Sequence, residues 1–430
     1  MTVAAKHVDL LVVGAGPVGL LTATALADRG LEVALIDEDW RSAVHSYAAL
    51  LHPRTLALLE RFGLGGELTG LGQRIDTVAF YEDEERRAEL SYAALGGNRG
   101  CALALPQSAL EEVLAAGLAR RGIGVAWNHR LAAFEVKNGT VRAWVDRLER
   151  VSGGYALAGT SRVVGASTTI GARCLIGADG HRSTVRRILG VPFEERAPGV
   201  VVGAFELAGP AVPHEVRVVV GEDGLGTLWP LPGDRCRWGF ELPAEPAAVA
   251  RASALRAPVL LGRRAWLVVR PEALALLLAR RAPWFRSEVT ELSWSVAVRF
   301  ERRLADPVGR DPVWLVGDAA HTTVPFGAWS MNCGLHEAAE LAERLADALT
   351  GGRRADVQDD WAERLAARWQ TLLAPGSGFG AGAAAGPWVR RHGARIPECV
   401  PATGEDLERL LAQIGLVPAG QLNAVPTSRP

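Results

Sequence analysis

Short apolar runs that alternate with helical segments mark the first part of the chain and a stretch near residue 315. Residues 8–13 predict a buried strand, residues 20–29 a helix, and residues 31–36 a second strand. Further along, a strand at 313–316 precedes a long helical pattern at 332–349. Strands that alternate with helices are typical of an α/β fold built on a parallel sheet.

The middle of the chain has a different pattern, in which apolar and polar residues alternate with a period of two. This pattern predicts a mostly antiparallel sheet. Asn138-Gly139 is part of a glycosylation sequon, but it also separates two strand-like runs, and Asn-Gly is typical of a tight hairpin turn. We therefore expect a hairpin there. The alternating segments are Val200–Leu207, Glu215–Val220, Thr227–Trp229 and Arg237–Leu242.

Composition narrows the class of protein. A chain of 430 residues with 49% hydrophobic content is long enough for two or three lobes, and its net charge of -1 argues against a nucleic-acid partner. Five scattered cysteines without CxxC spacing favour a reducing compartment, so we expect a cytoplasmic protein. The uncharged stretch Leu10–Ala27 is interrupted by glycines, so we expect no stable membrane insertion.

A glycine-rich turn follows the first predicted strand. In Gly14-Ala15-Gly16-Pro17-Val18-Gly19, the first glycine allows the turn, the second lets a pyrophosphate approach the backbone, and the third allows close packing of helix on strand. Asp37 ends the second strand, where a carboxylate can bind a ribose. The pattern predicts dinucleotide binding, but it does not distinguish FAD from NAD(P).

Two later segments decide between these cofactors. Residues 174–187 contain Asp179-Gly180 after a strand and then a basic helix start, and residues 313–321 contain Gly317-Asp318 after another strand. With the glycine turn, these motifs make residues 8–375 resemble the class A flavoprotein monooxygenases of the para-hydroxybenzoate hydroxylase type. We expect His321 to be structural. Arg182, Arg186 and Arg187 are either solvated or a site for a nicotinamide phosphate.

The resemblance implies an α/β fold with two main parts: a Rossmann-like FAD-binding domain of the glutathione-reductase type, and an inserted, mostly antiparallel substrate domain. Residues 375–389 are rich in glycine and predict a flexible connection, and a short helix is expected at 404–416. The predicted boundaries are 1–73, 101–186 and 304–374 for the FAD-binding domain, 74–100 and 187–303 for the substrate-binding domain, and 375–430 for a C-terminal linker and helix.

The resemblance also implies an FAD site. The glycines would hold the pyrophosphate, Asp37 the adenosine ribose and Asp318 the ribityl hydroxyls, while Asp179 would fix a turn. Gln107 would either reach the flavin or simply begin a helix that runs to Ala119. Backbone N–H groups of a later segment would meet the flavin pyrimidine edge. The residues so assigned are Gly14, Gly16, Gly19, Asp37, Gln107, Asp179, Asp318, Pro325, Gly327, Met331 and Asn332.

The chain departs from the family pattern in two places. Family members commonly have Gly-Gly-Gln-Gly where this sequence has Gly327-Ala328-Trp329-Ser330, and Tyr47 stands where many members have an arginine that contacts cofactor phosphates. Trp329 either stacks near flavin or substrate and restricts flavin movement, or points away into a hydrophobic wall.

The resemblance implies an FAD-dependent monooxygenase that uses NADPH or NADH and O2. It would hydroxylate or epoxidise an aromatic or polyketide-like natural product through a flavin C4a-hydroperoxide. No catalytic acid or base stands out, because the cofactor carries the hard chemistry. The alternative is a non-redox cyclase of the same fold that keeps FAD as a structural wall. Candidates for the substrate pocket are Trp229, Trp238, Phe240 and Trp329.

Overall fold

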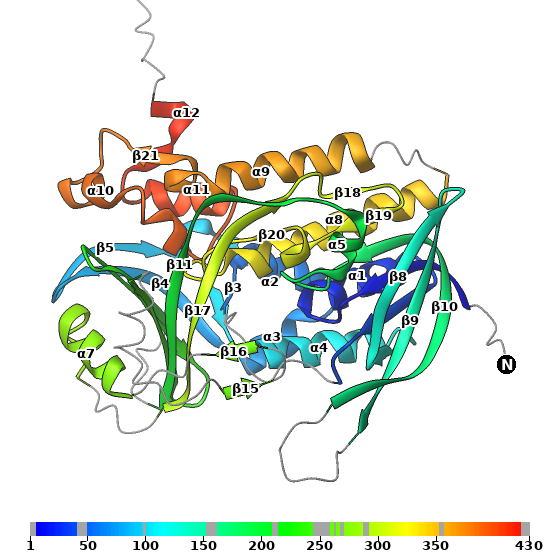
Figure 1. Cartoon of the computed structure of the whole chain (residues 1–430). Helices are drawn as coiled ribbons and strands as arrows, with labels where there is room; N and C mark the ends of the chain where they lie inside the picture. Colours follow the sequence, from blue (N-terminus) through cyan, green and yellow to red (C-terminus); the bar gives the residue numbers. More distant parts are fainter. Residues whose placement is uncertain are drawn as a thin grey trace, which may run out of the picture.

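The computed structural model describes most of the chain (Figure 1). Tyr47 and the segment around it lie outside the described residues, so the structure does not address the departure predicted there. The described ranges are 6–40, 50–97, 100–151, 161–208, 214–243, 259–261, 264–266, 271–286, 292–351 and 357–422.

The first sheet has the parallel order expected of a nucleotide-binding α/β fold. Its path is β18-β19-β10-β1-β2-β7, and every neighbouring pair from β19 to β7 is parallel. The carboxyl ends of β1, β10 and β19 therefore meet at one edge, where the three sequence motifs follow the strands. The bounds are β1 Lys6–Val13, β2 Val33–Asp37, β7 Val125–Trp127, β10 Ser161–Gly177, β18 Gly309–Arg310 and β19 Val313–Leu315.

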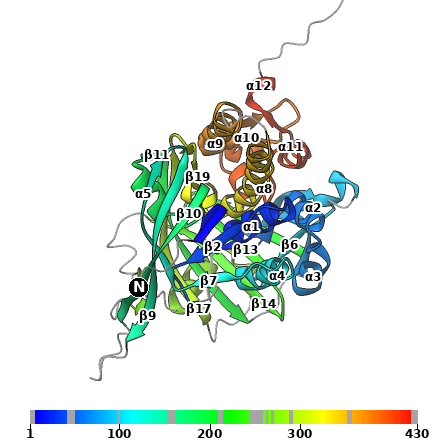
Figure 2. The ribbon, with the colours of Figure 1, turned by 90° about the vertical axis from the view of Figure 1, so that its right-hand side faces the viewer.

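Three helices pack together on this sheet. Helix α1 (Pro17–Asp28) contacts both α8 (Trp329–Leu349) and α4 (Gln107–Ala119), and Figure 2 shows it between them. Helix α1 is apolar on nearly all sides, and Leu20, Leu21 and Leu26 are completely buried, as expected of a helix covered by sheet and neighbours. Among the described helices, none combines the length and the apolar character needed to cross a membrane.

The predicted hairpin is present. Strands β8 (His129–Lys137) and β9 (Thr140–Val151) pair antiparallel, and Asn138 and Gly139 between them have φ of 52° and 70°. Both central residues therefore adopt the left-handed conformation that Asn-Gly tolerates, which confirms the expected turn.

The second sheet is mostly antiparallel and follows the order β20-β17-β11-β14-β13-β12-β4-β6-β3, with β5 paired to β4. One pair, β12 with β4, is parallel. Strands β3 and β6 belong to this sheet although the predicted boundaries placed their residues in the FAD-binding domain. The bounds are β3 Leu50–Leu51, β4 Gln73–Glu82, β5 Glu85–Ser91, β6 Ala102–Ala104, β11 Phe193–Ala208, β12 His214–Gly221, β13 Gly224–Leu231, β14 Arg235–Leu242, β17 Leu292–Ala305 and β20 His321–Thr322.

Residues 375–422 form regular elements, and they do not make the flexible connection predicted for 375–389. Strand β21 (Phe379–Ala381) pairs with β22 (Leu416–Pro418), and α10 (Pro387–His392) buries Val389. The predicted helix at 404–416 is the shorter α11 (Glu405–Ala412), which buries Leu407, Leu410 and Leu411. Figure 1 shows these elements together above β4 and β5.

The remaining elements connect or cover the two sheets. Helix α7 packs on one face of the second sheet, and α9 follows a π-helical turn beside α8. Their bounds are α2 Pro53–Arg61, α3 Gly65–Leu71, η1 Tyr92–Leu95, α5 Thr184–Leu189, β15 Val259–Leu261, β16 Arg264–Trp266, α7 Pro271–Arg281, η3 Gly317–Ala319, η4 Val357–Ala362, α9 Glu363–Leu373, η5 Pro375–Gly378, η6 Pro397–Cys399 and α12 Ala419–Leu422.

Candidate functional site

The three glycines of the first motif have different surroundings. A Cβ on Gly14, which has φ of 103°, would lie 2.3 Å from the carbonyl oxygen of Ala178, and one on Gly19 would lie 1.8 Å from that of Gly14. A Cβ on Gly16 would have nothing within 4 Å. Backbone therefore fills the space at the first and third glycines, whereas the second faces open space that a ligand can enter.

Asp37 connects the end of β2 to this turn. Its Oδ2 accepts a hydrogen bond from the Ala15 amide at 2.6 Å, and its Oδ1 accepts one from Asp39 at 2.8 Å. Burial raises the pKa of the Asp37 carboxyl to about 6, although both backbone donors act to lower it. The first turn of α1 beside it has no side-chain cap, so its N–H groups remain directed at the open space.

The second motif forms a turn centred on Asp179. Oδ2 of Asp179 accepts hydrogen bonds from the amides of Thr184 and Val185 at 2.7 and 3.1 Å, and Oδ1 is buried without a hydrogen-bond partner. An unpartnered buried carboxylate oxygen is uncommon in a complete site. Asp179 thus fixes the turn, as expected, and retains an acceptor for another donor.

Arg186 joins the second motif to the third. Its guanidinium donates to the carbonyls of His181 and Ala319, both at 2.7 Å, and packs over Phe193 at 3.8 Å. Arg186 is buried, so its side chain serves the fold and does not reach a nicotinamide phosphate. Arg182 and Arg187 are exposed.

Asp318 lies in the 3₁₀ turn that follows β19. Its side chain reaches solvent, yet loss of solvation by the surrounding protein raises the pKa of its carboxyl. The turn is packed closely against α8, since a Cβ on Gly334 would lie 2.9 Å from both Gly317 Cα and Val18 Cγ2.

A buried polar network lies behind Asp318. Glu337 accepts hydrogen bonds from His321 Nε2 at 2.5 Å, from Trp369 Nε1 at 2.7 Å and from Arg368 at 3.3 Å, and the His321 ring stacks on Trp369. Burial acts to raise the pKa of Glu337, but His321, Arg368 and Trp369 together hold it below its ordinary value. The contacts give His321 a structural environment, as the sequence suggested.

The segment from Pro325 to Asn332 is held by side-chain hydrogen bonds to its backbone. Ala328 has φ of 54°, and Asn332 donates to the carbonyls of Ala328 and Leu50 while it accepts from the His52 amide. The side chain of Asn332 is therefore occupied by protein groups. Met331 is half-buried in the first turn of α8.

His52 is a part of the site that the sequence did not reveal. Its Nε2 lies 2.8 Å from the Gly327 carbonyl oxygen, and burial lowers the pKa of the ring to about 3. The ring is therefore neutral, and Nε2 carries the hydrogen, because its partner is an acceptor. No local signal identifies His52, since its partner lies 275 residues away.

Gln107 begins α4, as expected. Its Nε2 donates to Oε1 of Glu111 at 2.6 Å, one turn along the same helix. This contact holds the Gln107 side chain at the start of the helix.

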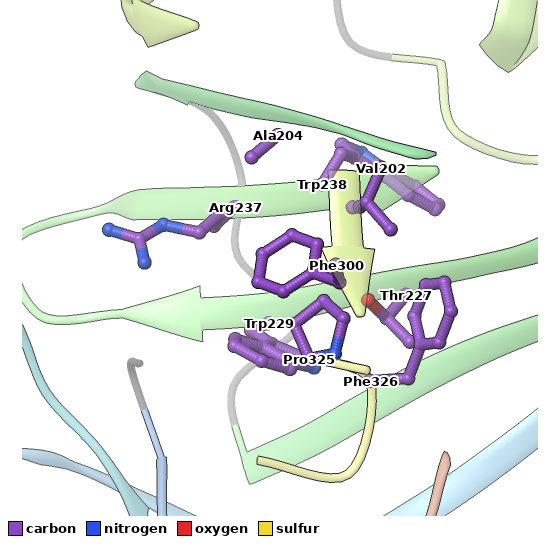
Figure 3. Close-up of a pocket in the computed structure, with 10 residues that line it drawn as sticks. Val202, Ala204, Thr227, Trp229, Arg237, Trp238, Phe300, Pro325 and Phe326 are labelled. Atoms are coloured by element: carbon purple, nitrogen blue, oxygen red, sulfur yellow. The ribbon is translucent and has the colours of Figure 1, made fainter. Parts of the chain in front are cut away.

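A pocket opens between the second sheet and the segment that begins at Pro325 (Figure 3). Its floor is made of small side chains, since Ala204, Gly239 and Thr227 are partners on adjacent strands and lie on one face. A single strand register places Glu206, Arg237 and Trp229 on the same face. The lining residues are Val202, Ala204, Thr227, Trp229, Arg237, Trp238, Gly239, Phe300, Pro325 and Phe326.

The predicted pocket residues differ in where they point. Trp229 lies on the pocket face, whereas the Trp238 and Phe240 rings stack on each other at 4.8 Å and belong to the core under α7. Trp238 borders the pocket from below, and Phe240 does not line it. Trp329 also lies elsewhere, because its Nε1 donates to the Val400 carbonyl oxygen at 3.0 Å. Side chains alternate between the two faces of a sheet, which explains why Trp229 lies on the pocket face and the Trp238–Phe240 pair on the other.

One edge of the pocket carries charge. Arg237 donates to Oε2 of the buried Glu206 at 2.6 Å, and Arg235 forms a second ion pair with the same carboxylate. In Figure 3 the Arg237 guanidinium points away from Phe300 and Pro325. Two cations and one carboxylate leave this edge with a net positive charge.

Comparison with known proteins assigns the chain to a family. A family model described as "FAD binding domain" matches residues 7–374. The 6-methylpretetramide 4-monooxygenase of Streptomyces rimosus is 30% identical over 368 residues, which cover 83% of this chain and 59% of that protein. The rifampicin monooxygenase of Rhodococcus hoagii is 27% identical, and the match covers 80% of this chain and 64% of that protein. The chain thus spans about three fifths of the length of these relatives.

A solved structure has a similar fold. The p-nitrophenol 4-monooxygenase of Pseudomonas putida DLL-E4 superposes with a TM-score of 0.69 at 20% identity, and the match covers 95% of this chain and 97% of that chain. The chain belongs to the FAD binding domain family, and its resemblance to the class A flavoprotein hydroxylases is confirmed. FAD is the cofactor of that family.

Proposed function

We propose that this protein is an FAD-dependent monooxygenase that uses NADPH or NADH and O2 to hydroxylate or epoxidise an aromatic or polyketide-like substrate. The observation that carries the proposal is the arrangement of all three motifs at the carboxyl ends of β1, β10 and β19, beside an apolar pocket on the second sheet. The five scattered cysteines of the chain agree with action in the reducing cytoplasm.

The residues at this edge suit FAD. The open space at Gly16 and the uncapped start of α1 suit a pyrophosphate, and the free acceptor of Asp179 lies in the adjoining turn. Asp37 would hold the adenosine ribose, and Asp318 the ribityl hydroxyls. Gly14 and Gly19 would shape the turn. Gln107, Pro325, Gly327, Met331 and Asn332 would complete the flavin side, where His52 fixes the Gly327 carbonyl.

The two sheets would have separate roles in the reaction. The sheet built on β1 would hold FAD, and the sheet that contains β11, β13 and β14 would form the wall of the substrate pocket. Bound flavin, once reduced, supplies the activation of O2. The protein would exclude water with Trp229, Phe300 and Phe326, and the positive edge at Arg237 would orient an acidic oxygen of the substrate.

The orientation of Trp329 bears on the cyclase alternative. That hypothesis depended on Trp329 restricting flavin movement and on Tyr47. The Trp329 ring is buried and hydrogen-bonded to Val400, away from the pocket, which supports the second alternative, a ring that points into a hydrophobic wall. The monooxygenase is therefore the function that the site supports best.

Anaerobic stopped-flow absorbance tests the proposal. The purified flavoprotein is mixed with NADPH or NADH, with and without a panel of aromatic polyketides, and then with isotopically labelled O2. We expect the flavin band to bleach faster with one ligand, and the product to gain one labelled oxygen atom. A flavin that stays oxidised under every condition, while a ligand is cyclised, would overturn the proposal in favour of the cyclase.

Filling the pocket should separate substrate binding from cofactor binding. Ala204→Leu adds a branched side chain to the small-residue floor, so we expect KM for the substrate to rise about tenfold or more while FAD content is unchanged. Ala93→Leu adds the same side chain at an exposed position, so this control should leave both KM and FAD content unchanged. A normal KM in Ala204→Leu would place the substrate elsewhere.

FAD affinity should depend on pH through Asp37. Because burial raises the pKa of this carboxyl to about 6, the apoprotein carries it protonated below that pH, and ribose hydroxyls donate best to the ionised form. We expect the affinity for FAD to be constant above pH 6 and to fall about tenfold per pH unit below it. Flavin fluorescence titrations of wild type and Asp37→Asn measure this. A dependence that persists in Asp37→Asn would point to another group.

A further inference from the structure

Three residues after position 397 are held by three separate parts of the fold. Arg302 of β17 pairs with Glu398 at 2.5 Å, Trp329 of α8 donates to the Val400 carbonyl oxygen at 3.0 Å, and Tyr92 donates to the Pro401 carbonyl oxygen at 3.1 Å. Residues 396–402 are called the C-terminal clamp below. Ile396, Cys399, Val400 and Ala402 within it are completely buried.

The clamp lies directly on the segment that forms one side of the pocket. A Cβ on Gly327 would lie 2.8 Å from the Glu398 carbonyl oxygen and 3.0 Å from that of Val400, so only glycine permits this approach. Gly327 is adjacent to Phe326, which lines the pocket together with Pro325. On its other side, the Gly327 carbonyl accepts from His52.

The clamp also holds the opposite side of the pocket. Phe300 lines the pocket from β17, and Arg302 lies two residues further along that strand, on the same face. The ion pair of Arg302 with Glu398 is largely buried, with side chains 17% and 18% exposed. The clamp therefore connects the strand of Phe300 to the segment of Pro325 and Phe326, and the spacing of the two walls depends on it.

The contact joins a segment beyond the family-model match to a residue that departs from the family pattern. The clamp lies after residue 374, where the match to the family model ends, and Trp329 stands where the family pattern commonly has glutamine. We infer that Trp329 and Glu398 are positioning residues: through the C-terminal clamp they fix the distance between Phe300 and the Pro325–Phe326 wall. The inference rests on the proposed function only in taking this pocket as the substrate site.

Hydrogen exchange of the apoprotein tests the clamp without any substrate. Trp329→Phe keeps an aromatic ring but removes the N–H donor, and Glu398→Gln keeps the shape but removes the charge that pairs with Arg302. Trp361→Phe is the matched control, because Trp361 is equally buried and its Nε1 has no partner. We expect the backbone amides of residues 326–332 to exchange about fivefold faster in the first two variants than in the control.

A second readout uses the FAD-loaded protein. Both clamp variants should keep the FAD content of the Trp361→Phe control, with KM for the substrate raised and kcat changed much less, because the pocket walls move and the cofactor site does not. Exchange rates at 326–332 within about twofold of the control, in either variant that folds, would overturn the clamp. Faster exchange with no substrate effect would support the clamp and contradict the proposed pocket.

Discussion

Replacing Glu337 with alanine will lower the free energy of unfolding by about 3–5 kcal/mol, because it removes the acceptor shared by the buried His321 and Trp369 and the more exposed Arg368. His321, Trp369 and Arg368 all donate to this carboxylate, which is completely buried. A buried donor that loses its protein acceptor cannot form a replacement hydrogen bond with water. Chemical denaturation at neutral pH measures the loss.

A matched control for this change lies on the same helix. Glu340 is one turn from Glu337, but its ion pairs with Arg344 and Arg364 are partly exposed, so Glu340→Ala should cost less than about 1 kcal/mol. The two variants should also differ in acid. The pKa of Glu337 is held below its ordinary value of 4.5, so its contribution is complete above that pH and is lost as the pH falls further. Equal losses for both variants at neutral pH would contradict the buried network.

Replacing Asp318 with alanine will strip FAD from the purified protein. We propose that this carboxylate binds the ribityl hydroxyls, and a charge-assisted hydrogen bond contributes about 1.5–3 kcal/mol, so the loss of two such bonds lowers the affinity for FAD by about a hundredfold or more. Flavin absorbance per protein after desalting measures the loss. Asp318→Asn should retain part of the flavin because an amide oxygen still accepts.

Two controls keep this result interpretable. Asp347→Ala removes an exposed carboxylate that pairs with Arg29, so it should keep a full complement of flavin. Circular dichroism of Asp318→Ala should match wild type, which separates lost binding from lost fold. A full flavin spectrum in Asp318→Ala would remove this residue from the cofactor site.

The sequence predicted those elements whose signals are local. The run before Gly14, the helix from Gln107 and the Asn138-Gly139 turn all combine a short apolar pattern with a residue that begins or ends an element. The confirmed family assignment rests on the same local motifs. The bounds of α8 were the exception, since the helix already begins at Trp329.

Contacts between distant segments could not be predicted in this way. The hydrogen bond from His52 to the Gly327 carbonyl and the clamp on Trp329 each join residues that no pattern relates. The second sheet shows the same limit, because alternation predicts two faces for β14 but not which of them α7 covers. Trp238 and Phe240 share one face and Arg237 the other, and only the packing of the sheet decides which is the pocket.

The parallel pairing of β4 with β12 has a consequence for folding. Ile75 pairs with His214, so β4 cannot complete its hydrogen bonds until a much later part of the chain has been synthesised. Until then, one edge of β4 presents unpaired N–H and C=O groups, together with the apolar side chains of Val78 and Phe80 that the finished sheet buries. A nascent chain of intermediate length therefore exposes a strand edge that can pair with other chains and aggregate. Chaperones that bind extended apolar segments would protect it during this interval.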